Sequence, residues 1–302
     1  MWLICGRNCR PGSHPRAAGA LSGTGCASIF ISAPAAIRLL EVRAGISWNF
    51  HDVKEWTNIS ITCSLGQNQS PVNLQSHVIG DNHGKKALEF LNYGKGAQQL
   101  EIRNTGHTVQ LSGTWGRRKP SIRGAIFSRE IYTISNVHLH WSTADNNGTE
   151  HAIEGRKYAA ELHLVHFNEK YQNVSEASLH PDGIAVVGIL YRVNDNVSPN
   201  PGMAQFAALA QQVLSVNASV RVATFNLASF ILQPLPPVYS YYGSLTTPPC
   251  TENVRWAILS EPQPISSTII RLLRNVILSD GDTHNIRPLQ PINNRLIEFY
   301  SH

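Results

Sequence analysis

The sequence predicts a mainly β protein, and three observations carry that prediction. From Ala87 to Leu111 apolar and polar residues alternate, with turn residues at 94–96 and 105–106 that are typical of hairpins. Helical patterns are few. No change in composition after residue 50 indicates a second domain, and 302 residues with 42% hydrophobic content can bury one large core. We therefore expect a leader over residues 1–45 and a single domain over residues 46–302.

Two stretches have a helical pattern. The first begins with Asn200-Pro201, a cap followed by a first-turn proline, and continues with apolar residues at nearly helical spacing as far as Val213. The second runs from Ser266 to Leu278. Strand-like patterns dominate the remainder, so a sheet should carry the fold.

Two strand-like stretches contain closely spaced histidines: Val137-His138-Leu139-His140-Trp141 and Glu161-Leu162-His163-Leu164-Val165-His166-Phe167. Successive side chains of a strand point to opposite faces, so His138 and His140 share a face, as do Glu161 and His163. If the strands are neighbours, His138, His140 and His163 form the ligand set of a catalytic zinc with an open fourth position. The Glu161 carboxylate can then hold the His163 ring. A histidine on an apolar strand is more often a packed residue than a ligand, so further motifs must support this site.

Two further motifs do so, Gln69-Ser70-Pro71-Val72-Asn73 before the histidines and Gly243-Ser244-Leu245-Thr246-Thr247-Pro248-Pro249 after them. With the motifs in this order, the chain from about Trp48 to about Phe299 resembles the alpha-class carbonic anhydrases, in particular their secreted or extracellular branch. The resemblance implies a large, twisted, mostly antiparallel central sheet with a few short surface helices. It also implies reversible hydration of carbon dioxide to bicarbonate and a proton, by attack of a zinc-bound hydroxide.

The resemblance assigns roles around the metal. Thr246 would accept a hydrogen bond from the hydroxide and donate its own proton to Glu150. Asn136 replaces a glutamine that commonly holds the first ligand, so we expect His138 to be held through a water or slightly displaced. The remaining assignments are a structural histidine, His151, and an apolar substrate pocket formed by Val165, Val186, Leu245, Thr247, Val254 and Trp256.

His107 stands where the family carries the histidine that moves protons between the metal site and buffer. The alternative is an exposed turn histidine without a role. Three departures from the family's common residues along the proton path favour that alternative: Phe50, Thr105 and Gln110.

Other functions remain open beside a zinc hydratase. Carbonic anhydrase-related binding modules generally lack one or more zinc histidines, whereas this chain keeps all three together with Thr246 and Glu150. Ester hydrolysis is an expected side activity of the same hydroxide, although a small apolar pocket favours carbon dioxide. We expect a monomer that binds sulfonamide-type inhibitors.

The net charge of +5 is unevenly placed. Residues 1–45 contain five arginines against one acid, so the rest of the chain is nearly neutral. This balance gives no electrostatic reason for binding nucleic acid or a membrane surface. No stretch of the domain approaches 18 apolar residues, so we expect no transmembrane segment.

The compartment is predicted from cysteines and glycosylation motifs. Cys63 and Cys250 are the two cysteines outside the leader, and the resemblance implies that they form a disulfide; two buried thiols are the alternative. Asn-x-Ser/Thr motifs occur at Asn58, Asn147, Asn173, Asn196 and Asn217. These features favour a secreted glycoprotein. The arginine-rich, acid-poor leader suits a mitochondrial transit peptide equally well, which is the alternative.

Overall fold

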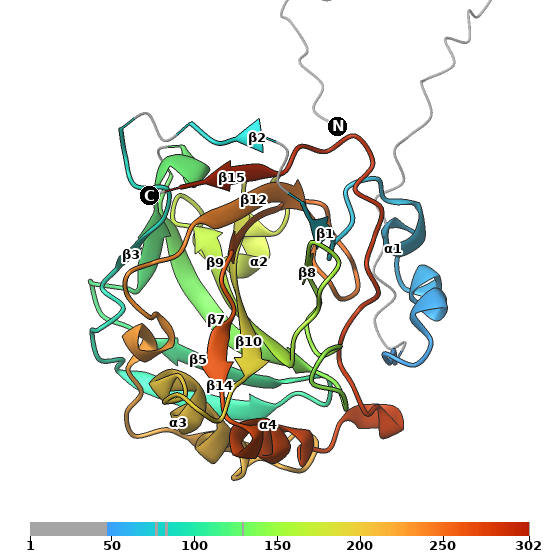
Figure 1. The fold of residues 1–302 in the computed structure, drawn as a ribbon, viewed down its shortest axis with the longest axis vertical. Helices are drawn as coiled ribbons and strands as arrows, with labels where there is room; N and C mark the ends of the chain where they lie inside the picture. The colour runs from blue at the N-terminus through green and yellow to red at the C-terminus, as the bar shows by residue number, and fades with distance from the viewer. Residues whose placement is uncertain (1–46, 76–77, 82–83, 129, 302) are drawn as a thin grey trace, which may run out of the picture. The chain divides into compact units, whose positions relative to one another are not determined.

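A sheet of thirteen strands carries the fold of the described residues. The computed structural model describes residues 47–75, 78–81, 84–128 and 130–301, so the predicted leader lies outside them (Figure 1). The strands are β2 Val78–Ile79, β3 Glu89–Leu91, β4 Gln99–Asn104, β5 Val109–Thr114, β6 Ser121–Arg123, β7 Tyr132–Trp141, β9 Ala160–Asn168, β10 Ile184–Val193, β11 Ser219–Arg221, β12 Val238–Gly243, β13 Val254–Leu259, β14 Gln263–Ile265 and β15 Glu298–Tyr300.

The main path of the sheet runs β11-β4-β5-β7-β9-β10-β13-β12-β15-β2. Strand β14 pairs with β10, and β6 pairs with both β3 and β7. Among its described strands, the parallel pairs are β10 with β13, β10 with β14, and β15 with β2. A separate parallel pair is formed by β1 Asn73–Leu74 and β8 Ala152–Ile153. The expected mainly β, mostly antiparallel architecture is therefore confirmed.

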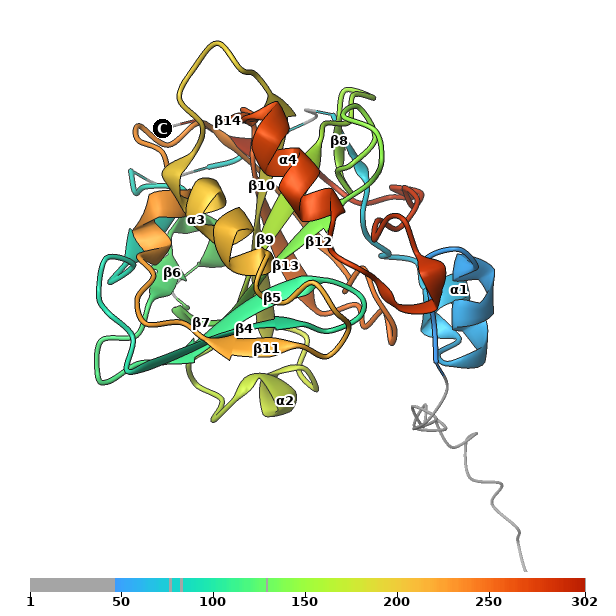
Figure 2. The same cartoon turned by 90° about the horizontal axis from the view of Figure 1, so that it is seen from below.

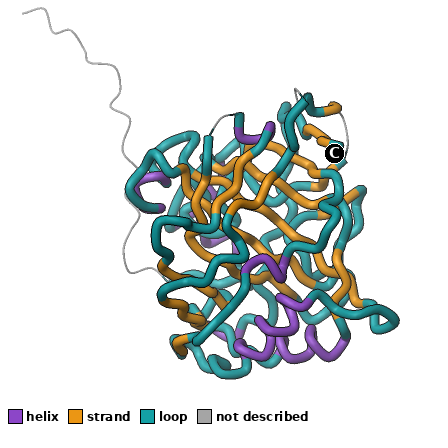
Figure 3. The backbone as a smooth tube through the Cα atoms, turned by 90° about the vertical axis from the view of Figure 1, so that its left-hand side faces the viewer, coloured by secondary structure: helices purple, strands orange, loops and turns teal. Residues whose placement is uncertain are grey.

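Helices are short and lie at the periphery of the strands (Figure 3). The α-helices are α1 Thr62–Leu65, α2 Val174–Ala177, α3 Pro201–Ala210 and α4 Ser267–Arg274. The 3-10 helices are η1 Val53–Asn58, η2 Ala125–Phe127, η3 Leu227–Phe230 and η4 Ser279–Gly281. Helices α3 and α4 lie side by side (Figures 1 and 2). No helix in the described part of the chain has the length and apolar character needed to cross a membrane.

Both predicted helices form, but each ends early. Asn200 caps α3 by accepting a hydrogen bond from the Met203 N–H at 3.0 Å, and Ser266 caps α4 in the same way. Helix α3 ends at Ala210, before Val213. Helix α4 ends at Arg274 rather than Leu278, because the Ile277 N–H donates to Leu214 O instead of continuing the helix.

The strands that hold the histidines have apolar side chains on both faces. On β9, Leu162 and Leu164 belong to one large core cluster, which also contains residues of α3 and α4. Val165, one residue further along, belongs to a second cluster with Val186 and Trp256. This arrangement follows from the two-residue period of a strand, and it buries β9 on both sides.

Candidate metal centre

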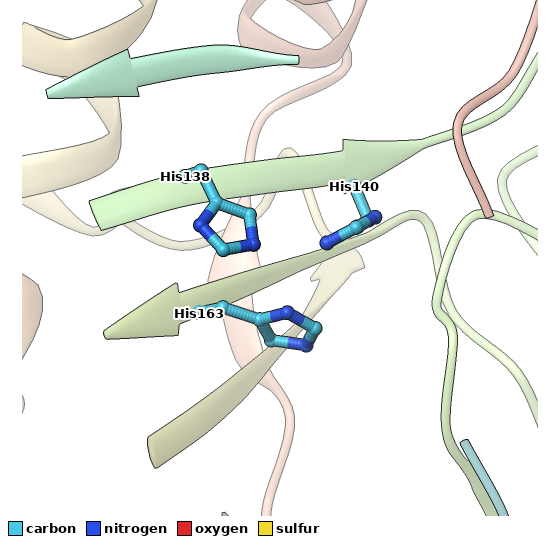
Figure 4. Close-up of side chains that lie close together, drawn as sticks. All are labelled: His138, His140 and His163. Carbon is cyan, nitrogen blue, oxygen red and sulfur yellow. The ribbon is translucent and has the colours of Figure 1, made fainter. Parts of the chain in front are cut away.

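Strands β7 and β9 are antiparallel neighbours, with His138 directly opposite His163 and His140 opposite Glu161. The three imidazoles project to the same side and face one another (Figure 4). One ring nitrogen from each histidine lies within 4.8 Å of the other two. The neighbouring strands expected from the alternating pattern therefore bring the three rings together.

Asn136 contacts the first of these histidines directly. Its Oδ1 lies 2.9 Å from Nδ1 of His138, and because a carbonyl oxygen only accepts, this nitrogen carries the proton. Strand β7 has a bulge between Ile134 and Asn136. Of the two alternatives expected for His138, the water bridge is not needed, since the shorter amide reaches the ring directly; a slight displacement of the ring stays a prediction.

The His140 ring is held by a segment far along the chain. Nδ1 of His140 donates to the backbone oxygen of Asn285 at 2.6 Å. Its Nε2 is buried without a hydrogen-bond partner and lies 3.6 Å from Glu150 Oε2. An unpartnered polar atom at such depth is uncommon in a folded protein.

Glu161 holds the third ring. Its Oε1 accepts from Nε2 of His163 at 2.8 Å and from Nδ1 of His151 at 2.6 Å, while its Oε2 accepts from the His151 N–H. The other nitrogen of His151 is 2.7 Å from the Tyr241 hydroxyl, which lies 2.8 Å from Ser70 Oγ. His151, Glu161 and His163 also lie close enough to hold a metal, but these hydrogen bonds account for their proximity.

The electrostatics favour neutral rings at His138 and His140 and an ionised carboxylate at Glu161. Burial, together with nearby His140 and His163, holds the pKa of His138 well below its ordinary value, and burial also lowers the pKa of His140. Burial alone would raise the pKa of Glu161. The charge of His151 and the hydrogen bonds from both histidines outweigh it and hold that pKa well below its usual range.

These hydrogen bonds decide which nitrogens are free. His138 and His140 use Nδ1 as donors, and His163 uses Nε2. Lone pairs therefore remain on Nε2 of His138, Nε2 of His140 and Nδ1 of His163, and the three rings face the same space (Figure 4). Three neutral nitrogen ligands fixed by outer hydrogen bonds fit a zinc ion.

Glu150 lies beside this centre, with its Oε2 3.6 Å from His140 Nε2, and Thr246 follows strand β12. Both are buried, and Oε1 of Glu150 accepts from the backbone N–H of Arg287 at 2.9 Å. Oε2 has no hydrogen-bond partner, and the hydrogen bond expected from Thr246 is not formed among the described residues. The Arg287 guanidinium donates to Gln69 Oε1, Ser70 O and Cys63 O, so it ties the Gln-Ser-Pro motif to this region.

The side chains expected to line an apolar pocket gather beside His163. Val165, Val186, Leu245, Val254 and Trp256 share one hydrophobic cluster. The Trp256 ring lies 4.9 Å from the His163 ring. Val254 is fully buried, whereas Leu245 and Thr247 are half-buried, so the latter two are better placed to meet a ligand.

His107 lies apart from the three histidines. Its ring stacks on Trp48 at 3.8 Å and has an edge contact with Phe50. Burial lowers its pKa, against the opposing effect of Asp282 and Asp280. In the described chain no ring contact joins His107 to His138, His140 or His163, and Asn285 contacts both the backbone of His107 and the ring of His140.

Cys63 and Cys250 form a disulfide that joins α1 to the segment after Thr247-Pro248-Pro249. The predicted pairing is confirmed. The Cys250 N–H donates to Thr247 O at 2.9 Å, so the bridge lies close in sequence to the Thr246 loop.

Sequence reasoning missed three contributors to the site. Asn285 holds His140, and Arg287 holds Glu150, through backbone groups, and a backbone contact cannot be recognised from the type of residue that makes it. Tyr241 stands in Val238-Tyr239-Ser240-Tyr241-Tyr242, where Tyr239 and Tyr241 are both buried and Tyr242 is exposed, so the two-residue period of the strand does not single out Tyr241.

Comparison with known proteins agrees with this geometry. A family model for eukaryotic-type carbonic anhydrases matches residues 51–301. Human carbonic anhydrase 6 is 32% identical over 252 residues, which cover 82% of this chain and 80% of the relative. Carbonic anhydrase 3 of Rattus norvegicus is 34% identical over 240 residues, which cover 77% of this chain and 89% of the relative. A putative carbonic anhydrase 5 of Caenorhabditis elegans is 35% identical over 246 residues, which cover 78% of this chain and 76% of the relative. This chain therefore belongs to the eukaryotic-type, or alpha, carbonic anhydrase family.

Proposed function

We propose that this protein is a zinc enzyme that interconverts carbon dioxide with bicarbonate and a proton, and that residues 46–302 are its catalytic domain. The observation that carries the proposal is the set of three imidazoles, each fixed by an oxygen acceptor so that one lone pair faces its neighbours. Family membership supports the choice of substrate. The intact ligand set argues against a related module that binds without catalysis.

Two sets of residues form the metal site, the three histidines and the groups that fix their rings. When bound, a zinc ion makes hydroxide available near neutral pH, as is well established for carbonic anhydrases. His138, His140 and His163 hold the metal, and Asn136, the Asn285 carbonyl and Glu161 keep their rings in place.

Thr246 would accept a hydrogen bond from the attacking oxygen and donate a hydrogen bond from its own hydroxyl to Glu150 Oε2, which would fix the direction of attack. Glu150 Oε2 is free to accept because Arg287 occupies Oε1. Val165 and Leu245 provide a surface suited to a molecule without hydrogen-bond donors.

Removing the metal tests the function. Chelator-treated protein should lose carbon dioxide hydration in a stopped-flow assay with a pH indicator, and added zinc should restore it. An aromatic sulfonamide should inhibit the restored sample, because its ionised nitrogen competes for the open position and donates its proton to Thr246. Full activity in protein shown to be metal-free, or ester hydrolysis without hydration, contradicts the proposal.

We also propose that His107 moves protons from the metal site to buffer, because histidine is the side chain whose unperturbed pKa lies near the working pH. Burial lowers the pKa of His107 from that ordinary value. His107→Ala should lower kcat in dilute buffer by at least about tenfold and leave kcat/KM for hydration unchanged. Added imidazole should recover kcat by acting as an external shuttle. If kcat in dilute buffer is unchanged, His107 is idle.

The proposed setting is an oxidising compartment, in which the protein is a secreted glycoprotein. The disulfide supports it, and the five asparagines Asn58, Asn147, Asn173, Asn196 and Asn217 are all exposed. A mitochondrial destination is the alternative. Sequencing the N-terminus of the mature protein distinguishes the two.

A further inference from the structure

The turn that carries His107 is attached to strand β7 by side chains rather than by a backbone ladder. Pairing between β5 and β7 runs from Ser112 opposite Asn136 to Gln110 opposite His138, and it ends there. The next residue of β7, Leu139, lies between the two metal histidines of this strand. Its buried N–H and C=O groups need other partners, because an unpaired backbone group costs stability.

Thr108 supplies both partners through one hydroxyl. Its Oγ1 donates to Leu139 O at 2.6 Å and accepts from the Leu139 N–H at 3.3 Å. Thr108 directly follows His107, so the hydroxyl takes the place of the next rung of the ladder. The distance from the His107 turn to β7 therefore depends on the side chain at position 108.

Asn285 makes a second attachment at the same place. Its Nδ2 donates to Leu139 O at 2.9 Å and to His107 O at 3.0 Å, and its Oδ1 accepts from the Trp141 N–H at 2.7 Å. The backbone oxygen of Asn285 accepts from Nδ1 of His140. One fully buried residue thus contacts both a metal histidine and the His107 turn.

The far side of the turn is also fixed. Gly106 has a φ of +86°, its N–H donates to Asn104 Oδ1, and its O accepts from the Ser279 N–H. A Cβ at Gly106 would lie 2.2 Å from Ser279 Oγ. The contacts on this side, from the Asn104 side chain and from backbone groups, do not reach β7. Among the described residues, Thr108 and Asn285 are therefore the side chains that connect the turn to the strand of His138 and His140.

We propose that Thr108 and Asn285 are positioning residues that set the place of the His107 turn relative to the metal ligands, an inference that rests on the proposed hydratase. Transfer of a proton between His107 and the metal site requires an aligned path, and rates of such steps fall steeply when a group is displaced by about 1 Å. The attachment should therefore govern proton transfer while leaving attack on carbon dioxide unaffected.

Substitutions at position 108 test this inference in the full-length zinc-loaded protein. Thr108→Val keeps the branched shape and removes the hydroxyl, whereas Thr108→Ser keeps the hydroxyl. Thr114→Val is the matched control, because Thr114 is exposed at the other end of β5. Relative to Thr108→Ser and Thr114→Val, Thr108→Val should lower kcat in dilute buffer by about fivefold to tenfold, leave kcat/KM within about twofold, and recover with imidazole. In a His107→Ala background it should cause no further loss.

Three results overturn the inference. Equal losses in kcat and kcat/KM would indicate general damage to the site. Equal kcat values for Thr108→Val and Thr108→Ser would show that the hydroxyl is irrelevant, and a further loss in the His107→Ala background would show that it acts elsewhere. Failure of the proposed function appears differently: the zinc-loaded wild type would not hydrate carbon dioxide, or His107→Ala would keep its full kcat, and the inference would fall with it.

Discussion

His163→Ala should abolish hydration and release the metal from the protein. The substitution removes the one ligand on β9 and leaves the two histidines on β7. Glu161, also on β9, loses one of the two rings that it holds. Two imidazoles do not complete the three-ligand set of a catalytic zinc site. Elemental analysis after dialysis should give well under one zinc per chain, and zinc should no longer raise the melting temperature.

His166→Gln is the matched control, because His166 lies three residues further along β9 with its ring near Tyr93 rather than the metal histidines. This variant should lose stability, since its ring is buried, yet keep zinc and kcat/KM in the folded fraction. Circular dichroism measures that fraction for both variants. Full zinc occupancy with full activity in His163→Ala would refute the metal assignment.

Local pattern predicted the metal histidines because the period of a strand is two residues. That period places His138 and His140 on one face of β7, and the register that sets His138 opposite His163 adds the third ring from β9. The outer contacts could not be predicted in the same way. The oxygen that holds His140 belongs to a backbone group 145 residues later, and no property of Asn285 in the sequence marks it.

Of the two alternatives expected for His138, the water bridge is not found, because that alternative judged the reach of Asn136 from side-chain length alone; a slight displacement of the ring stays a prediction. The position of the backbone matters as much, and here Asn136 Oδ1 reaches His138 without a water. The early end of α4 has a similar origin. Apolar spacing continued to Leu278, but a tertiary hydrogen bond from Ile277 to Leu214 took the backbone out of the helix.

Removing the disulfide should have the largest effect on stability. The bridge closes 187 residues, and in the chain-entropy model a loop of this length contributes about 4–5 kcal/mol to the free energy of unfolding. The double variant Cys63→Ser/Cys250→Ser should therefore unfold at a clearly lower guanidinium concentration, with a similar slope. Wild-type protein treated with a reductant should approach the same midpoint.

Catalysis should be far less sensitive to this change than stability. Without the bridge, the same segments remain connected by hydrogen bonds from Gln69 Nε2 to Cys250 O at 3.1 Å and from Arg287 Nη2 to Cys63 O at 2.7 Å. At a temperature where the double variant is fully folded, kcat/KM should thus stay close to that of the wild type. If the oxidised wild type and the double variant unfold at the same guanidinium concentration, the bridge has no stabilising role. Two free thiols in protein from its natural source would show that the bridge does not form there and would weaken the case for a secreted protein. A folded variant without activity would instead show that the Thr246 loop depends on the covalent link, because its hydrogen bonds alone do not hold it in place.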